Sequence, residues 1–436
     1  ASGGEQLSPE ARRSMIGGIA SLLVDSYDIY LPAFVLPAAM GYFEPATLPA
    51  SIKVTLVTLI FAVTLLARPI GGPIFGNLSD KWGRKRVTML TATGFTITTF
   101  VTALIPGYQS WGYGSIAALL FLRLVAGVFL GGGYAGPVPL AIERSPKHLR
   151  GLVGGMIAAG APVAILFISL TQLAFLARLS PEAYQTWGWR MPYLFGVILG
   201  ILYLIYYSRV PELETTFRQA QRVREPLWDL FSRGTFKNLV QVFLLMTGMW
   251  FAAQMVLSFL PGLLIGILHQ SPKNVSTLEI LANVFTALGM IGYAALSQRI
   301  GRRRMLVGIG ISILVGESLA YLLMVTAARS GSGFFLIGLL ALIAFFLANS
   351  PLGCVVVYLN ERFPTRVRGS AYGTAYTVSL ILPSLYSFWL LWLSKIVPYA
   401  YTALILIVLG GILFLWAALW GPETRDVVLL EPSQEG

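Results

Sequence analysis

Residues 76–86 read GNLSDKWGRKR, a short and highly charged segment from which the rest of the sequence can be interpreted. Long apolar runs flank this segment, at about 51–79 and 87–106. A helix needs about 20 apolar residues to cross a bilayer, so each run is long enough to span one. The charged segment is therefore predicted to be a loop between two membrane-spanning helices.

The alternation of long apolar runs with short charged gaps continues along the whole chain. Ten further runs are long enough to cross a bilayer, which predicts an all-α membrane protein with 12 transmembrane helices. The predicted spans are 14–41, 51–79, 87–106, 114–142, 151–178, 189–208, 238–268, 278–298, 304–328, 333–360, 369–396 and 399–420.

The composition agrees with a chain that faces lipid. Charged residues make up 11% and hydrophobic residues 56%, with a mean hydropathy of +0.74, whereas a soluble domain carries about 25% charged residues. The net charge of +12 does not indicate a nucleic-acid partner, because the basic residues form short clusters between apolar runs. The one cysteine, Cys354, excludes an internal disulfide.

The placement of the basic residues predicts the orientation. Most of the 31 Lys and Arg residues fall in alternate gaps, beginning with Arg12 and Arg13 and continuing through the cluster at 81–86. Cytoplasmic segments of membrane proteins are enriched in Lys and Arg. We therefore expect a multi-pass protein of the plasma (inner) membrane, with both termini in the cytoplasm. We also expect the protein to be a monomer.

Two segments of the first half recur in the second half. Residues 79–86 (SDKWGRKR) correspond to 297–304 (SQRIGRRR), which lie 218 residues further along the chain. The segment that starts at Glu143 and ends in Arg150-Gly151 corresponds, at the same offset, to the one that starts at Glu361. Repeats of this kind predict two similar bundles related by an axis along the membrane normal, with a substrate site between them near the midplane.

The repeat divides the chain into parts. We expect an N-terminal six-helix bundle at 1–208, a cytoplasmic linker at 209–237, a C-terminal six-helix bundle at 238–420 and a cytoplasmic tail at 421–436. Two halves around one central site are the design required for alternating access, which channels and receptors do not need.

Three motifs resemble those of the major facilitator superfamily. The run at 76–86 resembles its signature between the second and third helices, and RLVAG at 123–127 resembles its arginine motif in the fourth helix. PETR at 422–425 is similar to the closing motif of the sugar-porter branch. The resemblance implies the twelve-helix fold of that superfamily and secondary active transport.

Further details resemble the metabolite:proton symporters of that superfamily. These are RPIGG at 68–72, DSYD at 25–28 and WRMP at 189–192. Asp25 stands where that family more often has Glu, and Ser26 where an aromatic residue is common. The resemblance implies symport of protons with small organic acids, or with zwitterions such as betaine and proline. Its implied coupling ion is H⁺, and no other cofactor or metal is expected.

Five charged residues fall well inside the predicted spans, away from their ends: Asp25, Asp28, Arg68, Arg123 and Glu317. Burying a charge in a bilayer costs at least about 2.5 kcal/mol, so each is a candidate for function. The first two are three residues apart and share a helix face, which suits proton coupling together with Arg123. Arg68 is the candidate for binding a substrate carboxylate, because a guanidinium binds carboxylates bidentately. Structural pairing of the acids with the two arginines is the alternative. The role of Glu317 is left open.

Polar and aromatic residues of the second half complete the predicted binding site. Each lies at mid-helix depth, where it can either orient a substrate or bond one helix to another. The candidates are Trp250, Gln254, Asn283, Asn349, Tyr372 and Tyr376.

The charged loops predict a cytoplasmic gate. The resemblance implies that Asp80, supported by Arg84, caps the N-terminus of the helix that starts near Gly369. An acid is favoured there by the helix dipole. The equivalent residue of the second half is Gln298, so a weaker contact is expected. Two further charge partnerships are expected at the gate, namely Glu143 with Arg150 and Glu361 with Arg368.

The leading hypothesis is a proton-coupled symporter of a small organic anion, whose partners are a small carboxylate substrate and the lipid bilayer. A sugar or neutral-solute transporter is the first alternative, favoured by the motif at 422–425. A drug/proton antiporter is the second, although Gly160-Ala161-Pro162 lacks the glycine pair of the antiporter motif. A non-transporting receptor would not need the intramembrane charges. The absence of catalytic motifs in the sequence argues against an enzyme.

Overall fold

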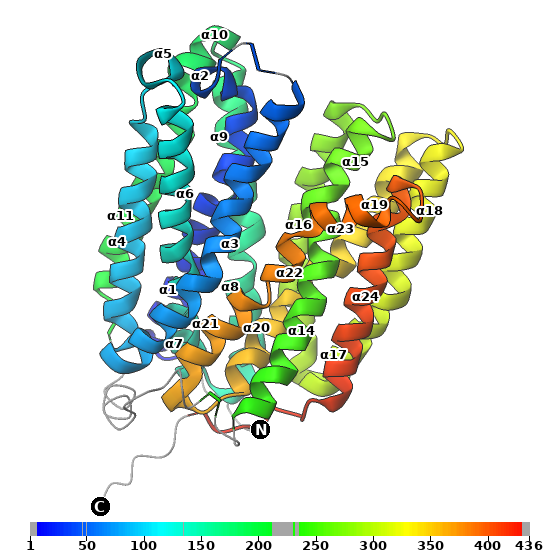
Figure 1. Ribbon diagram of the computed structural model, residues 1–436. Coiled ribbons are helices and arrows are strands. Elements are labelled where there is room, and N and C mark those ends of the chain that lie inside the picture. The colour runs from blue at the N-terminus through cyan, green and yellow to red at the C-terminus, as the bar shows by residue number, and fades with distance from the viewer. Residues whose placement is uncertain are drawn as a thin grey trace, which may run out of the picture.

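The computed structural model describes residues 7–45, 47–48, 50–133, 135–211, 230–231 and 235–429. Within these residues the chain is helical and contains no strand. Two bundles stand side by side, one built from the first half of the chain and one from the second (Figure 1). Most of the predicted linker at 209–237 lies outside the described residues, so the predicted domain boundaries stay predictions.

The N-terminal bundle is built around six long helical paths, several of which are interrupted. Its elements are α1 (Pro9–Val35), η1 (Leu36–Ala38), α2 (Met40–Phe43), α3 (Ala50–Trp82), α4 (Arg84–Ala103), α5 (Tyr108–Trp111), α6 (Gly114–Gly132), α7 (Pro137–Glu143), η2 (Lys147–Leu149), α8 (Arg150–Ala158), α9 (Gly160–Leu176), α10 (Pro181–Ala183), η3 (Tyr184–Gly188) and α11 (Arg190–Ser208).

The C-terminal bundle has the same order of long paths. Its elements are α14 (Phe236–Gln254), η4 (Met255–Phe259), α15 (Leu260–Gly266), α16 (Pro272–Ile300), α17 (Arg302–Ile311), η5 (Ser312–Glu317), α18 (Ser318–Arg329), α19 (Phe334–Asn349), α20 (Leu352–Glu361), η6 (Thr365–Val367), α21 (Arg368–Val378), α22 (Ile381–Ser384), α23 (Tyr386–Leu393) and α24 (Tyr399–Trp420).

Eleven of the paths in the described chain are long and apolar enough to cross a membrane. The helix outside this set is α4, which has 20 residues and packs against α6 and α11. Its hydropathy is lowered by threonines, most of which face the bundle interior, including Thr91, Thr98, Thr99 and Thr102. Counted with the eleven, α4 is consistent with the twelve-helix prediction.

Large apolar side chains cover much of the outer surface of both bundles. Phe335, Phe388 and Leu288 are 84%, 70% and 63% exposed, and all three lie on membrane-length helical paths. An aqueous surface does not hold so much apolar area in one belt, whereas lipid does.

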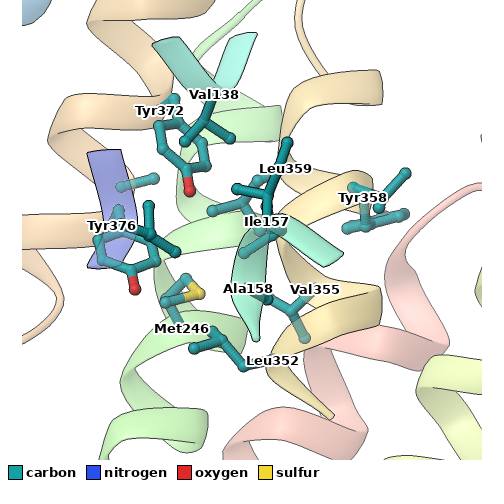
Figure 2. Close-up of a cluster of buried hydrophobic side chains, with 14 of the residues drawn as sticks. Val138, Ile157, Ala158, Met246, Leu352, Val355, Tyr358, Leu359, Tyr372 and Tyr376 are labelled. Carbon is teal, nitrogen blue, oxygen red and sulfur yellow. The ribbon is translucent and has the colours of Figure 1, made fainter. Parts of the chain in front are cut away.

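The two bundles share one hydrophobic core near the middle of the molecule. In Figure 2, Ile157 and Ala158 of α8 lie beside Leu352 and Leu359 of α20, with Met246 of α14 close by. All five are buried. The halves are therefore packed against each other and are not merely tethered by the linker.

The predicted repeat is visible in the backbone. Gly83 and Gly301, which are 218 residues apart, both adopt φ 100°, in the left-handed region that favours glycine. Each one separates two long helices, α3 from α4 and α16 from α17. The same sharp turn thus occurs at the same point of each half.

Candidate functional site

A cavity lies between the two bundles. From the first half it is lined by α1, α3 and α9, and from the second half by α14, α16, α19 and α21, together with nearby residues. Its position between the repeats is the one at which transporters of this architecture bind substrate.

Five of the seven predicted substrate residues line this cavity, and these are Arg68, Trp250, Asn283, Asn349 and Tyr376. They come from five different helices of both halves. The indole of Trp250 meets the Tyr376 ring edge-on, with 5.3 Å between ring centroids, and donates a hydrogen bond to the Tyr376 carbonyl oxygen at 3.2 Å. The guanidinium carbon of Arg68 lies 6.0 Å from the centroid of the Tyr376 ring.

The other two predicted residues do not line the cavity. Gln254 is buried and accepts a hydrogen bond from the Ser258 hydroxyl, while Tyr372 is buried behind Tyr376, with stacked rings 5.4 Å apart. Because a helix has 3.6 residues per turn, the side chains of residues four apart point in directions that differ by about 40°. The structure therefore leaves Gln254 and Tyr372 off this cavity wall, and their predicted role in substrate binding stays a prediction.

Several residues of the wall were not predicted from the sequence. Tyr30 and Ser26 extend it along α1, Pro162 forms part of it on α9, and Thr286 lies one turn below Asn283 on α16. The spacing of Asn283 and Thr286 on one helix was a signal that could have revealed Thr286.

Asp28 and Arg123 form an ion pair inside the N-terminal bundle. Arg123 Nη1 lies 3.5 Å from Asp28 Oδ2, and both side chains are almost fully buried. Thr99 of α4 donates to Asp28 Oδ1 and Arg123 Nη2 donates to the Thr102 hydroxyl at 3.3 Å. The guanidinium carbon of Arg123 also lies 5.8 Å from the centroid of the Tyr193 ring.

Asp25 has different surroundings, although it is on the same helix. Its side chain is fully buried, Oδ2 accepts from the Ser21 hydroxyl at 3.4 Å, and Oδ1 has no hydrogen-bond partner in the described chain. It packs against the backbone of Gly133, where a methyl group would lie 2.3 Å from Oδ2. Of the two acids, only Asp28 is ion-paired within the described chain.

The gate residues form a buried network at the end of the molecule where the chain begins (Figure 1). Asp80 Oδ1 accepts from the Gly369 N–H at 3.0 Å, and Oδ2 accepts from the Ser370 N–H at 2.6 Å. Arg84 donates to Asp80 at 2.8 Å. The acid of α3 thus caps the first turn of α21 from the opposite half, as the resemblance implied.

The charge partnerships expected at the gate were wrong. Glu143 Oε1 accepts from Arg84 of its own half at 3.1 Å and from Arg368 of the other half at 2.5 Å. Glu361 pairs with Arg302, at 3.1 Å. Arg150 instead donates to the carbonyl oxygens of Ser145 and Val427. The fold brings Glu143 to the interface between the halves, where a partner 225 residues away is nearer than one in its own loop.

The second half repeats the capping contact in a neutral form. Gln298 Oε1 accepts from the Gly151 N–H at 3.2 Å, at the start of α8, so this contact also crosses between the halves. An uncharged amide interacts less with a helix dipole than a carboxylate does.

The chain after α24 runs beneath both halves. Glu423 accepts from the N–H groups of Arg302 and Arg303, at the start of α17. Further along, the carbonyl oxygen of Val427 accepts from Arg150 at 2.7 Å, and that of Asp426 accepts from Lys147 at 3.3 Å. The motif at 422–425 thus binds the C-terminal bundle, and residues 426–427, which follow it, bind the N-terminal one.

Two pseudo-symmetric bundles, a central cavity with a few polar groups on its wall and a network that closes one end define a secondary transporter of the membrane. The chain belongs to the Major Facilitator Superfamily, whose family model matches residues 16–387. The resemblance seen in the loop motifs is confirmed.

The sequence relatives are transporters of metabolites. The inner membrane metabolite transport protein YhjE of Escherichia coli K12 is 28% identical over 382 residues, covering 84% of each chain. The proline/betaine transporter of the same organism is 28% identical, covering 86% of this chain and 76% of the relative. Its shikimate transporter is 27% identical, covering 85% of each.

Solved structures share the fold. The proton:xylose symporter XylE bound to 6-bromo-6-deoxy-D-glucose superposes with a TM-score of 0.81 at 18% identity, covering 98% of this chain and 99% of that one. A partially occluded inward-open structure of XylE from E. coli gives a TM-score of 0.70 at 17% identity, covering 96% and 99%.

Proposed function

We propose that this protein is a proton-coupled symporter that carries a small carboxylate-bearing metabolite across the inner membrane by alternating access. The observation that carries the proposal is Arg68, a buried guanidinium on the wall of the cavity between the halves. A positive charge in that position favours an anionic group on the substrate, and a guanidinium can bind a carboxylate through two parallel hydrogen bonds.

The Asp28–Arg123 pair supports proton coupling. Because it lies inside the N-terminal bundle and Asp28 is not part of the cavity wall, protonation of Asp28 would not compete with substrate for the same space. Protonation removes the charge that holds Arg123, and the released guanidinium alters the packing of α1 against α6. Asp25, one turn earlier and without an ion pair in the described part of the chain, is the second candidate for a proton site.

The gate network supports alternating access. Asp80, Glu143 and Arg368 tie the two halves together at the end that the basic residues predict to face the cytoplasm. At the opposite end the ribbons of the two bundles diverge (Figure 1). We assign this arrangement to a state closed on the cytoplasmic side, in which opening to the cytoplasm requires these contacts to break.

A zwitterion with a quaternary ammonium group is a second candidate substrate. Tyr30, Trp250 and Tyr376 place aromatic rings on the same cavity wall as Arg68, and aromatic faces attract such cations. The similarity to a proline/betaine transporter supports this candidate. A sugar would make no use of Arg68 as an anion site.

The proposal is tested with purified protein in liposomes that contain a pH-sensitive dye. Pools of small carboxylic acids, of betaine-type zwitterions and of sugars are added separately to the outside. Proton entry with the acids supports the leading proposal, and entry with the zwitterions supports the second candidate. Proton entry with sugars alone would contradict both and reduce Arg68 to a structural role.

A further inference from the structure

Two hollows on the outside of the C-terminal bundle meet at Ile300 and Arg304. One lies beside the start of α17 and is lined by Arg303, Arg425 and Glu423 as well as Arg304. The other is an apolar groove between α16 and α17. Neither belongs to the central cavity or to the gate.

The first hollow is positively charged. It holds three guanidinium groups and one carboxylate. Arg303 and Arg425 donate to the carbonyl oxygens of Leu419 and Arg299, whereas the exposed Arg304 has no hydrogen bond or ion pair within the described chain. An anion held here would meet a guanidinium with all of its donors available.

The groove runs inward from that charged end. On α16 it extends from Phe285 to Ile300, a rise of about 22 Å at 1.5 Å per residue. That is more than the depth of one leaflet's hydrocarbon, about 15 Å as half of the 30 Å core. The groove is therefore long enough to hold an acyl chain along its full depth.

Glycines keep the groove open. A methyl group added at Gly292 or Gly308 would meet no atom within 4 Å. The equivalent positions of the first half, 218 residues earlier, hold Ile74 and Leu90, whose side chains are 48% and 44% exposed. The hollow at these positions therefore arises from residues that the first half does not share.

We propose that these two hollows form a binding site for one anionic phospholipid. Arg304 binds the phosphate in the basic hollow, with Arg303 beside it, and an acyl chain lies in the groove over Gly292 and Gly308. The combination of a cationic end and an apolar, leaflet-deep groove matches the two parts of such a lipid.

Native mass spectrometry of the purified full chain tests the site, using phosphatidylglycerol and phosphatidylcholine with identical acyl chains. We expect one phosphatidylglycerol to bind in preference, and Arg304→Gln to weaken it about fivefold, as loss of one basic residue at a membrane surface predicts. The double variant Gly292→Ile, Gly308→Leu copies the first half and is expected to reduce binding of both lipids.

Gly262→Leu is the matched control, because Gly262 of α15 is also an exposed helical glycine with nothing within 4 Å, outside the groove. It is expected to leave lipid binding unchanged, and thermal unfolding checks that every variant is folded. Equal phosphatidylglycerol binding by all variants would show that lipid binds only non-specifically to the surface, and it would overturn the proposal. A dimer that disappears only when the groove is filled would also overturn it, by showing a second copy to be the occupant.

Discussion

Asp28 is held by partners that no local sequence pattern indicates. Thr99 and Thr102 of α4 and Tyr193 of α11 surround the Asp28–Arg123 pair. Breaking a buried pair by removing one charge leaves the other uncompensated, which typically costs about 3–5 kcal/mol. The pair is thus sensitive to the protonation of Asp28, and this sensitivity is what a proton-coupled step needs.

Replacing Asp28 with Asn mimics the protonated acid permanently. Asp28→Asn is expected to abolish uphill, proton-driven accumulation while preserving counterflow exchange, since the substrate cavity itself is unchanged. Both are measured with radiolabelled substrate in proteoliposomes. Accumulation driven by a pH gradient that survives the substitution would exclude Asp28 as the coupling group, and Asp25→Asn would then be examined.

Arg68 is expected to contribute through the geometry of its guanidinium as well as its charge. Arg68→Lys keeps the charge but removes the planar fork, so we expect affinity for a carboxylate substrate to fall by more than about tenfold. Isothermal titration or a binding-induced change in Trp250 fluorescence measures it. A neutral substrate analogue serves as the control, and unchanged carboxylate affinity would argue for a structural Arg68.

At the scale of helices, the contact between α3 and α21 combines a capped helix end with close backbone packing. Asp80 bonds the first N–H groups of α21. A methyl group added at Gly373 would lie 2.4 Å from the carbonyl oxygen of Gly72. The two helices are therefore near their distance limit, and any side chain at this crossing would separate them.

Asp80→Asn removes the negative charge that interacts with the dipole of α21 and with Arg84. We expect it to shift the protein toward a state open at the gate end, seen as faster labelling of an Ala371→Cys probe in a Cys354→Ser background. Gln298→Glu adds the missing charge at the start of α8 and is expected to slow labelling. If labelling is equal in all three proteins, the contact does not control the gate.

Gly373→Ala tests the close packing independently of charge. The added methyl cannot be accommodated without moving α21 away from α3, so the same probe is expected to label faster than in the parent. Gly333→Ala is the matched control, because the position is open and a methyl there meets nothing within 4 Å. Slower labelling in Gly373→Ala would contradict the predicted separation.

At the scale of the whole molecule, the segment after α24 is anchored to the C-terminal bundle through Glu423 and reaches the N-terminal bundle at Asp426 and Val427. Partial burial acts to raise the pKa of Glu423, but hydrogen bonds from the N–H groups of Arg425, Arg302, Arg303 and Thr424 outweigh this and lower it. A carboxylate whose pKa is lowered by folding stabilises the folded arrangement when the pH is above the ordinary pKa of 4.5. This contribution to stability is lost as the pH falls through the lowered pKa.

We therefore expect docking of this segment to weaken in acid, below about pH 4.5. Amide hydrogen exchange at residues 302–303 and 424–425 is compared with that of Glu423→Gln at each pH, which cancels the intrinsic pH dependence of exchange. The difference in protection should be present at neutral pH and vanish in acid. A difference that persists unchanged at low pH would rule out the Glu423 charge as its cause.

The class of fold, the two halves and five residues of the cavity wall could be predicted from the amino-acid sequence alone. Apolar length, basic clusters and the 218-residue repeat are properties of individual segments. They can be recognised without knowing which helices are neighbours in the fold. Arg68, Trp250 and Asn283 were found because polar groups at membrane depth are costly and thus few.

Which groups contact each other could be learned from the three-dimensional structure alone. Glu143 with Arg368, Thr99 with Asp28 and the hollow over Gly292 and Gly308 depend on the distance and rotation of helices far apart in the chain. Periodicity places a residue on a helix face, but it does not state which helix that face contacts. For that reason, Trp250 and Tyr376 line the cavity, whereas Gln254 and Tyr372, four residues away on the same helices, do not.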